Sequence, residues 1–253
     1  MGSLEPLDRQ PLTARLAGAA SMRSELEHVL AAVEPGATPA QFRAAILEGN
    51  AARKSTHTAR DWAWKRLKLR YALDSTDAAE FIAFERAMRD ADPAGRGLSA
   101  YLMLARTDRL FRETSLKLVV PVLDQAGTVV ESEAVLEHVD AARKAAGLEW
   151  STASVRATAG HVMTSWKEFG VVEGSKVRRI ARLRPSHATM RLMIELARAQ
   201  GLTDRQALEG TWPQLLGMDF RAVDTALRSA ARDGALQYRT QADVVEIILP
   251  EDR

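Results

Sequence analysis

The most constraining feature of this sequence is an order of elements that occurs twice after Gly127. The first copy predicts a helix over residues 132–146, a second helix over 151–170, and two short strands over 171–172 and 177–183. Within the second helix, apolar residues recur every three or four positions and form a single stripe for burial. Helix, helix, hairpin is the order of a winged helix-turn-helix.

The second copy predicts helices over 190–199, 204–209 and 219–232, followed by the strands LQYR and VVEIIL. Its charge differs from that of the first copy, because residues 219–253 contain five basic and seven acidic residues. We therefore interpret this terminal unit as a packing or protein-contact module and not as a DNA reader.

Before Gly127 the sequence is helical, with Gly and Pro mostly between periodic stretches. Thr38 is the expected N-cap of a helix that has Pro39 in its first turn. The predicted helices cover residues 21–33, 39–52, 57–72, 76–91, 97–112 and 113–124. The expected fold is mainly α: a multi-helix bundle with winged-helix-like units that carry short β-hairpins. The expected units are an N-terminal arm and helix (1–35), a helical domain (36–126), a winged-helix-like unit (127–185) and a C-terminal winged-helix-like packing module (186–253).

Positive charge is concentrated in two segments, although the net charge of the chain is only +2. The first basic segment, residues 41–73, has eight basic and two acidic residues, or +6. The second basic segment, residues 150–184, has seven basic and two acidic residues, or +5, which leaves 2 − 6 − 5 = −9 for the remainder. Such polarisation is typical of a protein that binds a polyanion.

Each basic segment also has a purely structural interpretation. The helix over residues 57–72 has Trp64 on one apolar face and Trp62 on the other, so it fits between two layers with its long cations reaching solvent. Hydroxyls and cations at its N-terminus instead favour phosphate contact. Arg178, Arg182 and Arg184 alternate onto one strand face, as in a wing that touches a nucleic-acid backbone or in a solvated hairpin paired with acidic groups. The residues predicted to contact nucleic acid are Arg53, Lys54, Ser55, Thr56, Thr58, Arg60, Lys65, Lys68, Arg156, Lys167, Lys176, Arg178, Arg182 and Arg184.

Catalytic and metal-binding motifs are absent from the sequence. There is no GxxxxGK[ST] phosphate loop, no HExxH and no cysteine, and the five histidines stand without partners at ligand spacing. No enzyme activity, metal or cofactor is expected. The absence of cysteine and of a long apolar run, together with an N-terminus unlike a signal peptide, predicts a cytoplasmic protein without a membrane span.

Several stretches, taken in order, resemble the BrxA family, an accessory component of bacteriophage-exclusion (BREX) defence systems of bacteria. The matching stretches are Asn50 with Lys54, Ser55, Thr58, Arg60 and LRYALD at 69–74, then YLMLARTDRLFRE at 101–113, and STASVRATAGHVMTSWKEFGVVEG at 151–174. The resemblance implies a non-enzymatic, mostly helical protein that binds double-stranded DNA, with a core similar to the NusB antitermination fold. It implies no catalytic residues, and its DNA contacts would fall chiefly on Lys54, Ser55, Thr58 and Arg60.

The expected function is binding of double-stranded DNA, mainly through phosphates, as a component of an antiphage defence system with other defence proteins as partners. A monomer is favoured over an oligomer. One alternative is a scaffold whose basic segments dock acidic proteins. Another is a winged-helix transcription regulator, which requires a dimer and a palindromic site. An RNA ligand is also open, although the aromatic motifs of single-strand recognition modules are missing.

Overall fold

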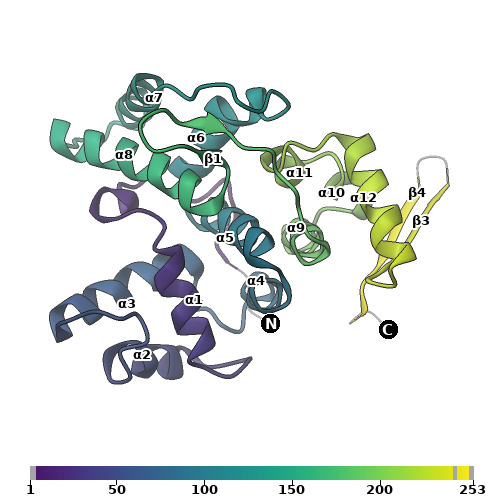
Figure 1. The fold of residues 1–253 in the computed structure, drawn as a ribbon, viewed down its shortest axis with the longest axis horizontal. Helices are drawn as coiled ribbons and strands as arrows, with labels where there is room; N and C mark the ends of the chain where they lie inside the picture. The colour runs from purple at the N-terminus through teal and green to yellow at the C-terminus, as the bar shows by residue number, and fades with distance from the viewer. Residues whose placement is uncertain (1–3, 242–243, 251–253) are drawn as a thin grey trace.

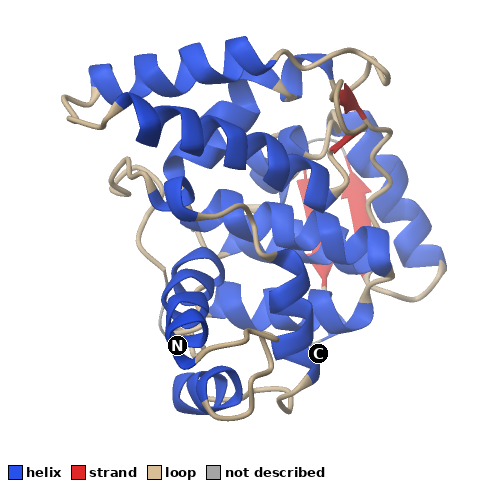
Figure 2. Cartoon of the chain, turned by 60° about the vertical axis from the view of Figure 1, so that its left-hand side comes forward, coloured by secondary structure: helices blue, strands red, loops and turns tan. Residues whose placement is uncertain are grey.

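The computed structural model describes residues 4–241 and 244–250 and is 59% helical. Its α-helices are α1 (Arg23–Ala31), α2 (Pro39–Leu47), α3 (His57–Tyr71), α4 (Ala79–Asp90), α5 (Pro93–Thr107), α6 (Arg109–Leu118), α7 (Ser132–Ala145), α8 (Thr152–Phe169), α9 (His187–Arg198), α10 (Asp204–Ala207), α11 (Thr211–Leu215) and α12 (Phe220–Arg232). Two 3-10 helices, η1 (Arg15–Gly18) and η2 (Val120–Val122), and two antiparallel strand pairs complete the described elements. The strands are β1 (Val172–Glu173) with β2 (Arg179–Ile180), and β3 (Gln237–Gln241) with β4 (Val244–Ile248). Figure 2 shows how little of the molecule is strand. The predicted helical fold with short hairpins is confirmed.

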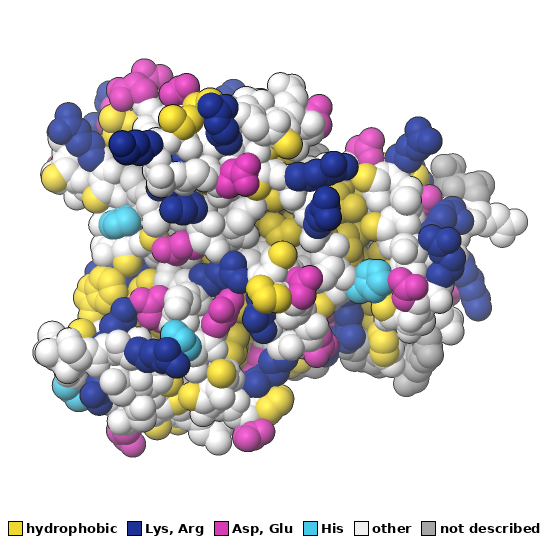
Figure 3. Space-filling model, in the orientation of Figure 1, with side chains coloured by type: hydrophobic (Ala, Val, Ile, Leu, Met, Phe, Trp, Pro, Cys, Tyr) yellow, Lys and Arg dark blue, Asp and Glu magenta, His cyan; other side chains and the backbone are white. Residues whose placement is uncertain are grey.

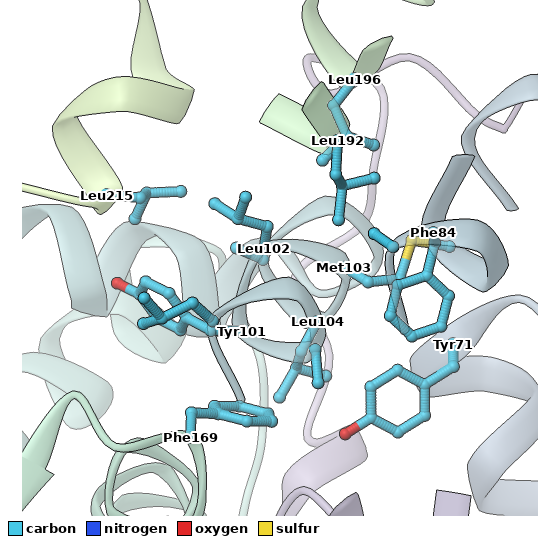
Figure 4. Close-up of a cluster of buried hydrophobic side chains, with 14 of the residues drawn as sticks. Tyr71, Phe84, Tyr101, Leu102, Met103, Leu104, Phe169, Leu192, Leu196 and Leu215 are labelled. Carbon is cyan, nitrogen blue, oxygen red and sulfur yellow. The ribbon is translucent and has the colours of Figure 1, made fainter. Parts of the chain in front are cut away.

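Helix α5 lies at the centre of the molecule, with α1–α3 on one side, α7 and α8 on another, and α9–α12 on a third (Figure 1). Nearly every residue of α5 from Gly95 onward is buried. Figure 4 shows side chains of residues 101–104 reaching toward the surrounding helices, toward Tyr71, Phe84, Phe169, Leu192 and Leu215. These residues belong to one continuous hydrophobic core. Both winged-helix-like units are therefore seated on the same helix.

Two glycines let α5 approach these units closely. A Cβ atom added at Gly97 would lie 2.6 Å from the carbonyl oxygen of Phe169, at the end of α8. One added at Gly95 would lie 2.5 Å from Oγ of Ser186, the residue that caps α9. Thr189 of α9 also donates its hydroxyl to the Gly95 carbonyl oxygen at 3.1 Å. The start of α5 thus lies against both the end of α8 and the start of α9.

Buried arginines hold the N-terminal segment against the helical core. Arg106 forms a fully buried ion pair with Glu80 at 2.8 Å, and Glu80 also accepts the backbone N–H of Leu4 at 3.3 Å. Arg112 donates to the side-chain oxygen of Gln10 at 3.0 Å and to the carbonyl oxygen of Leu7 at 3.3 Å. A carboxylate, an amide oxygen and backbone oxygens thus pair with these cations, as burial of charge requires.

Capping residues explain where the predicted boundaries were right and wrong. Thr38 and Gln41 form a reciprocal capping box at α2, as the N-cap prediction for Thr38 requires. The predicted boundary between helices 97–112 and 113–124 is wrong, because the Asp108 side chain accepts the N–H of Phe111 at 2.9 Å and starts α6 there. Helix α2 ends at Leu47 and not near residue 52.

The C-terminal part of the chain contains one helix that the sequence patterns did not predict. Helix α11 is a single turn that begins after Gly210 and has Pro213 in its first turn, where a missing N–H is tolerated. The second strand of the first hairpin is also shorter than predicted, since β2 ends at Ile180. Arg182 and Arg184 therefore lie on the exposed connector to α9 and not on a strand face.

Candidate nucleic-acid interface

The loop between α2 and α3, where the first basic segment was predicted to meet phosphate, is joined to the rest of the molecule by its cations. Lys54 forms an ion pair with Glu25 of α1 at 2.6 Å, and its backbone N–H donates to the Asn50 side chain at 2.8 Å. Arg60 donates to the carbonyl oxygen of Leu47 at 3.1 Å and to that of Lys54 at 3.4 Å. These contacts tie α3 to the end of α2.

The remaining predicted residues of this loop face solvent. Thr56 is the N-cap of α3 and accepts the backbone N–H of Ala59 at 3.1 Å. Arg53, Ser55 and Thr58 are exposed, and Arg53 has a left-handed backbone conformation with φ of 53°. Phosphate contact by these four residues stays a prediction.

Along α3 the cations are either paired or buried. Lys65 lies 2.7 Å from Asp61, and this hydrogen bond lowers the pKa of Asp61 below its ordinary value. Lys68 lies 3.7 Å from Asp74. Arg70 is 2% exposed and donates to the carbonyl oxygen of Ala19 at 2.7 Å, and burial lowers its pKa below the ordinary value. Each of these three cations thus has an internal partner, and the positive charge available to a ligand is smaller than the sequence count of +6.

Arg66 and the two Trp residues of α3 are also accounted for by packing. The Arg66 guanidinium lies 3.8 Å from the centroid of the Trp62 ring, a cation–π distance. Trp64 is buried in the core with Leu67 and Tyr71, as predicted for that face of the helix. Neither Trp ring is an open platform for stacking a base.

The second basic segment has the helix, helix, hairpin order that the sequence predicts. A short stretch around Val129 pairs antiparallel with Arg179 of β2, and β2 pairs in turn with β1. The chain therefore runs α6, edge stretch, α7, α8, β1, turn, β2, with β2 central in the small sheet. Within it α8 ends at Gly170, which adopts the left-handed conformation with φ of 77°.

Helix α8 buries the predicted apolar stripe and exposes the predicted polar one. Val155, Val162 and Trp166 are buried, and Trp166 donates its indole N–H to Ser115 at 2.8 Å. Arg156 and Lys167 are both exposed, as their eleven-residue spacing predicts. Gly160 lies between them and faces open space.

Acidic residues of α7 surround the Arg156 end of this helix. Arg156 lines a shallow hollow together with Glu133, Glu137 and Asp140. Asp140 is itself paired with Arg143 at 2.7 Å and with Lys144 at 2.6 Å. The start of α8 is therefore electrostatically mixed.

Beyond the end of α8 lies a surface that we call the wing surface. It consists of Lys167, Lys176, Arg178, Arg179, Arg182 and Arg184. Within the described part of the chain, Lys167, Lys176, Arg182 and Arg184 are exposed and have no carboxylate within ion-pair distance. Arg178 donates to the carbonyl oxygen of Gly174, and Arg179 donates to that of Gly127 at 2.9 Å. Figure 3 shows Lys and Arg side chains on the face that carries α8 and the connector to α9.

Arg179 belongs to the wing surface but is missing from the residues predicted to contact nucleic acid. The sequence contains a signal for it, because it lies in the basic run KVRRIAR between Lys176 and Arg182. Its bond to Gly127 fastens the edge stretch to the hairpin and leaves its remaining guanidinium N–H groups available. Six of the seven cations of the second basic segment thus lie on or next to one hairpin in the chain, while Arg156 lies apart from them beside α7, and the first segment is distributed among internal partners.

Neither a metal centre nor a membrane-spanning helix is found among the residues that the structure describes. No group of three or more His, Asp or Glu side chains there is close enough to hold a metal ion. No helix in residues 4–241 or 244–250 combines the length and apolarity needed to cross a bilayer.

Comparison with known proteins adds no assignment. No protein-family model matches the sequence, and no curated protein matches it either.

Proposed function

We propose that this protein binds double-stranded DNA without catalysis, chiefly through contacts between the wing surface and phosphate groups. The observation that carries the proposal is the group of four exposed, carboxylate-free cations (Lys167, Lys176, Arg182 and Arg184) around the hairpin of a winged-helix unit. Unpaired cations release the counterions of a phosphate backbone on binding, which favours association. Arg178 and Arg179, held by backbone carbonyls, present their guanidinium groups beside them.

Phosphate contact explains the surface better than base reading does. The exposed stripe of α8 has small residues between Arg156 and Lys167, and its first turn faces acidic side chains of α7. Base recognition in the major groove usually requires Arg, Lys, Asn or Gln side chains at the base edges. We therefore propose weak sequence preference.

The cellular setting in this proposal comes from the resemblance to the BrxA family. On that basis the protein would serve a bacterial antiphage defence complex, with other defence proteins as partners. It would act in the cytoplasm, where phage and host DNA are both present, and bind as a monomer.

The direct test is fluorescence anisotropy with a duplex of about 30 base pairs over a series of salt concentrations. If about six phosphates are neutralised, log affinity falls with log salt at a slope of about −5. Single-stranded DNA and RNA of the same sequence serve as competitors and are expected to compete poorly. A slope shallower than about −2, or equal competition by RNA, contradicts the proposal.

A further inference from the structure

Helix α12 has a row of exposed arginines on its outer face. Arg221, Thr225, Arg228 and Arg232 follow one another at spacings of four, three and four, and all are exposed. Val223, Leu227 and Ala230 occupy the opposite, buried face. Because eleven residues of α-helix rise by about 16 Å, the three arginines form a straight row along the helix. We call this row the α12 stripe.

The α12 stripe is only partly neutralised. Within residues 4–241 and 244–250, Arg221 and Arg232 have no carboxylate at ion-pair distance. Arg228 pairs with Asp224 at 2.9 Å, while its side chain stays 56% exposed. Asp224 also accepts the hydroxyl of Tyr238 at 2.8 Å, so the middle of the stripe is held in place from β3.

The stripe occupies the same position in its unit as α8 does in the first unit. Helix α12 is followed directly by the β3–β4 hairpin, as α8 is followed by β1–β2. Side-chain bonds close this second unit: Asp204 of α10 accepts the backbone N–H of Ile247 at 2.7 Å, and Arg198 of α9 donates to the carbonyl oxygen of the same residue. In both units, the helix that directly precedes the hairpin buries one face and exposes basic residues on another.

Helices of both units pack on the same central helix, α5, in one hydrophobic core. At the start of α5, Gly97 closely approaches Phe169 at the end of α8, and Gly95 closely approaches Ser186 at the start of α9. In the view of Figure 3, Lys and Arg side chains lie over the α8 side, over the connector and over the α12 side of the same face. A row of cations along one helix, such as the α12 stripe, fits a long polyanion better than it fits a small ligand.

We infer that the α12 stripe is a second phosphate-binding surface, which contacts the same DNA duplex as the wing surface when that duplex is long enough to reach both. This inference rests on the proposed function, and it differs from the interpretation of the terminal unit as a packing module. The net acidic count of residues 219–253 conceals the stripe, because Asp219 caps α12 and Asp233 lies 3.5 Å from His187. Neither carboxylate pairs with Arg221 or Arg232.

The test combines a double charge reversal, Arg221→Glu with Arg232→Glu, and duplexes of about 10, 20, 30 and 40 base pairs. Arg9→Glu with Arg43→Glu is the matched control, since both residues are exposed, lack carboxylate partners in the described chain, lie outside the residues predicted to contact DNA and give the same change in charge. Affinity is measured by anisotropy. At each duplex length the affinity of the variant is divided by that of wild type, because longer duplexes offer more binding positions to both proteins alike. Melting temperatures establish that both variants are folded.

The inference predicts that the α12 variant loses about 30-fold in affinity on the longest duplexes and less than about 2-fold on the shortest. Its salt slope on long duplexes should be shallower by about 2, because two counterion-releasing contacts are lost. The control should stay within about 2-fold of wild type at every length. An α12 variant that matches wild type on long duplexes overturns the inference, as does an equal loss at every length. Failure of wild type to bind any duplex instead overturns the proposed function, so the two results are distinguishable.

Discussion

The two basic segments have nearly the same charge, +6 over residues 41–73 and +5 over residues 150–184, but they place it differently. In the first, Lys54, Lys65 and Lys68 meet carboxylates, Arg60 binds backbone oxygens and Arg70 is buried. In the second, four cations around one hairpin face solvent without such partners in the described chain. A local excess of Lys and Arg is therefore a weak guide to a binding surface until the partners of each side chain are known.

The largest expected effect on stability is at Arg70, the most deeply buried basic residue of the first segment. Replacing Arg70 by Ala removes a buried side chain and leaves the Ala19 carbonyl oxygen without its donor. The free energy of unfolding should fall by about 3 kcal/mol. Chemical denaturation measures this, with Lys65→Ala as the control on the same helix, because Lys65 is 65% exposed and should cost no more than about 0.5 kcal/mol. A loss below about 1 kcal/mol for Arg70→Ala would mean that Arg70 is not structural.

A smaller effect is expected at Arg60, which ties α3 to the end of α2. The Arg60→Ala variant loses hydrogen bonds to the carbonyl oxygens of Leu47 and Lys54, and should lose about 1 kcal/mol of stability. Its affinity for duplex DNA should change by less than about 2-fold. A large loss of affinity with unchanged stability would instead mean that Arg60 contacts DNA.

The smallest expected effect is on the pH dependence of stability, through Asp108 in the core beside the first segment. Burial raises the pKa of Asp108 above its ordinary value. A carboxyl whose pKa is raised on folding stabilises the folded state below its unfolded pKa, and that contribution is lost as pH rises through the folded pKa. Asp108→Asn keeps the acceptor that caps α6 but cannot ionise. In thermal unfolding, the melting temperature of Asp108→Asn minus that of wild type should therefore increase from pH 4 to pH 7. A constant or decreasing difference would contradict this prediction.

Much of the fold was predictable from local patterns. The apolar stripe of α8, the Thr38 cap and the Gly170 stop each depend on residues near one another in the chain, and all are found in the structure. The errors arose where a single side chain decides the outcome: Asp108 splits two helices that periodicity alone would divide elsewhere. The short helix α11 depends on a proline in the one turn that tolerates it.

The candidate site was less predictable, because charge partners are set by tertiary contacts. Lys54 and Glu25 are 29 residues apart, and no spacing rule pairs them. Arg182 and Arg184 were predicted from an alternating strand pattern but lie on a connector. The sequence count does not single out the arginines of α12, because residues 219–253 are acidic in total, whereas a helix can expose its basic residues on one face.

The most direct measurement compares two charge-reversed proteins on the same DNA duplex. One carries Lys176→Glu, Arg182→Glu and Arg184→Glu in the wing surface, and the other carries Arg43→Glu, Arg53→Glu and Lys65→Glu in the first basic segment. All six residues are exposed, and each triple changes the net charge by −6. With both proteins folded, the wing triple should bind about 100-fold more weakly than wild type, with a salt slope shallower by about 3, while the other triple stays within about 3-fold. An equal or greater loss in the first-segment triple would contradict the assignment of DNA binding to the wing surface.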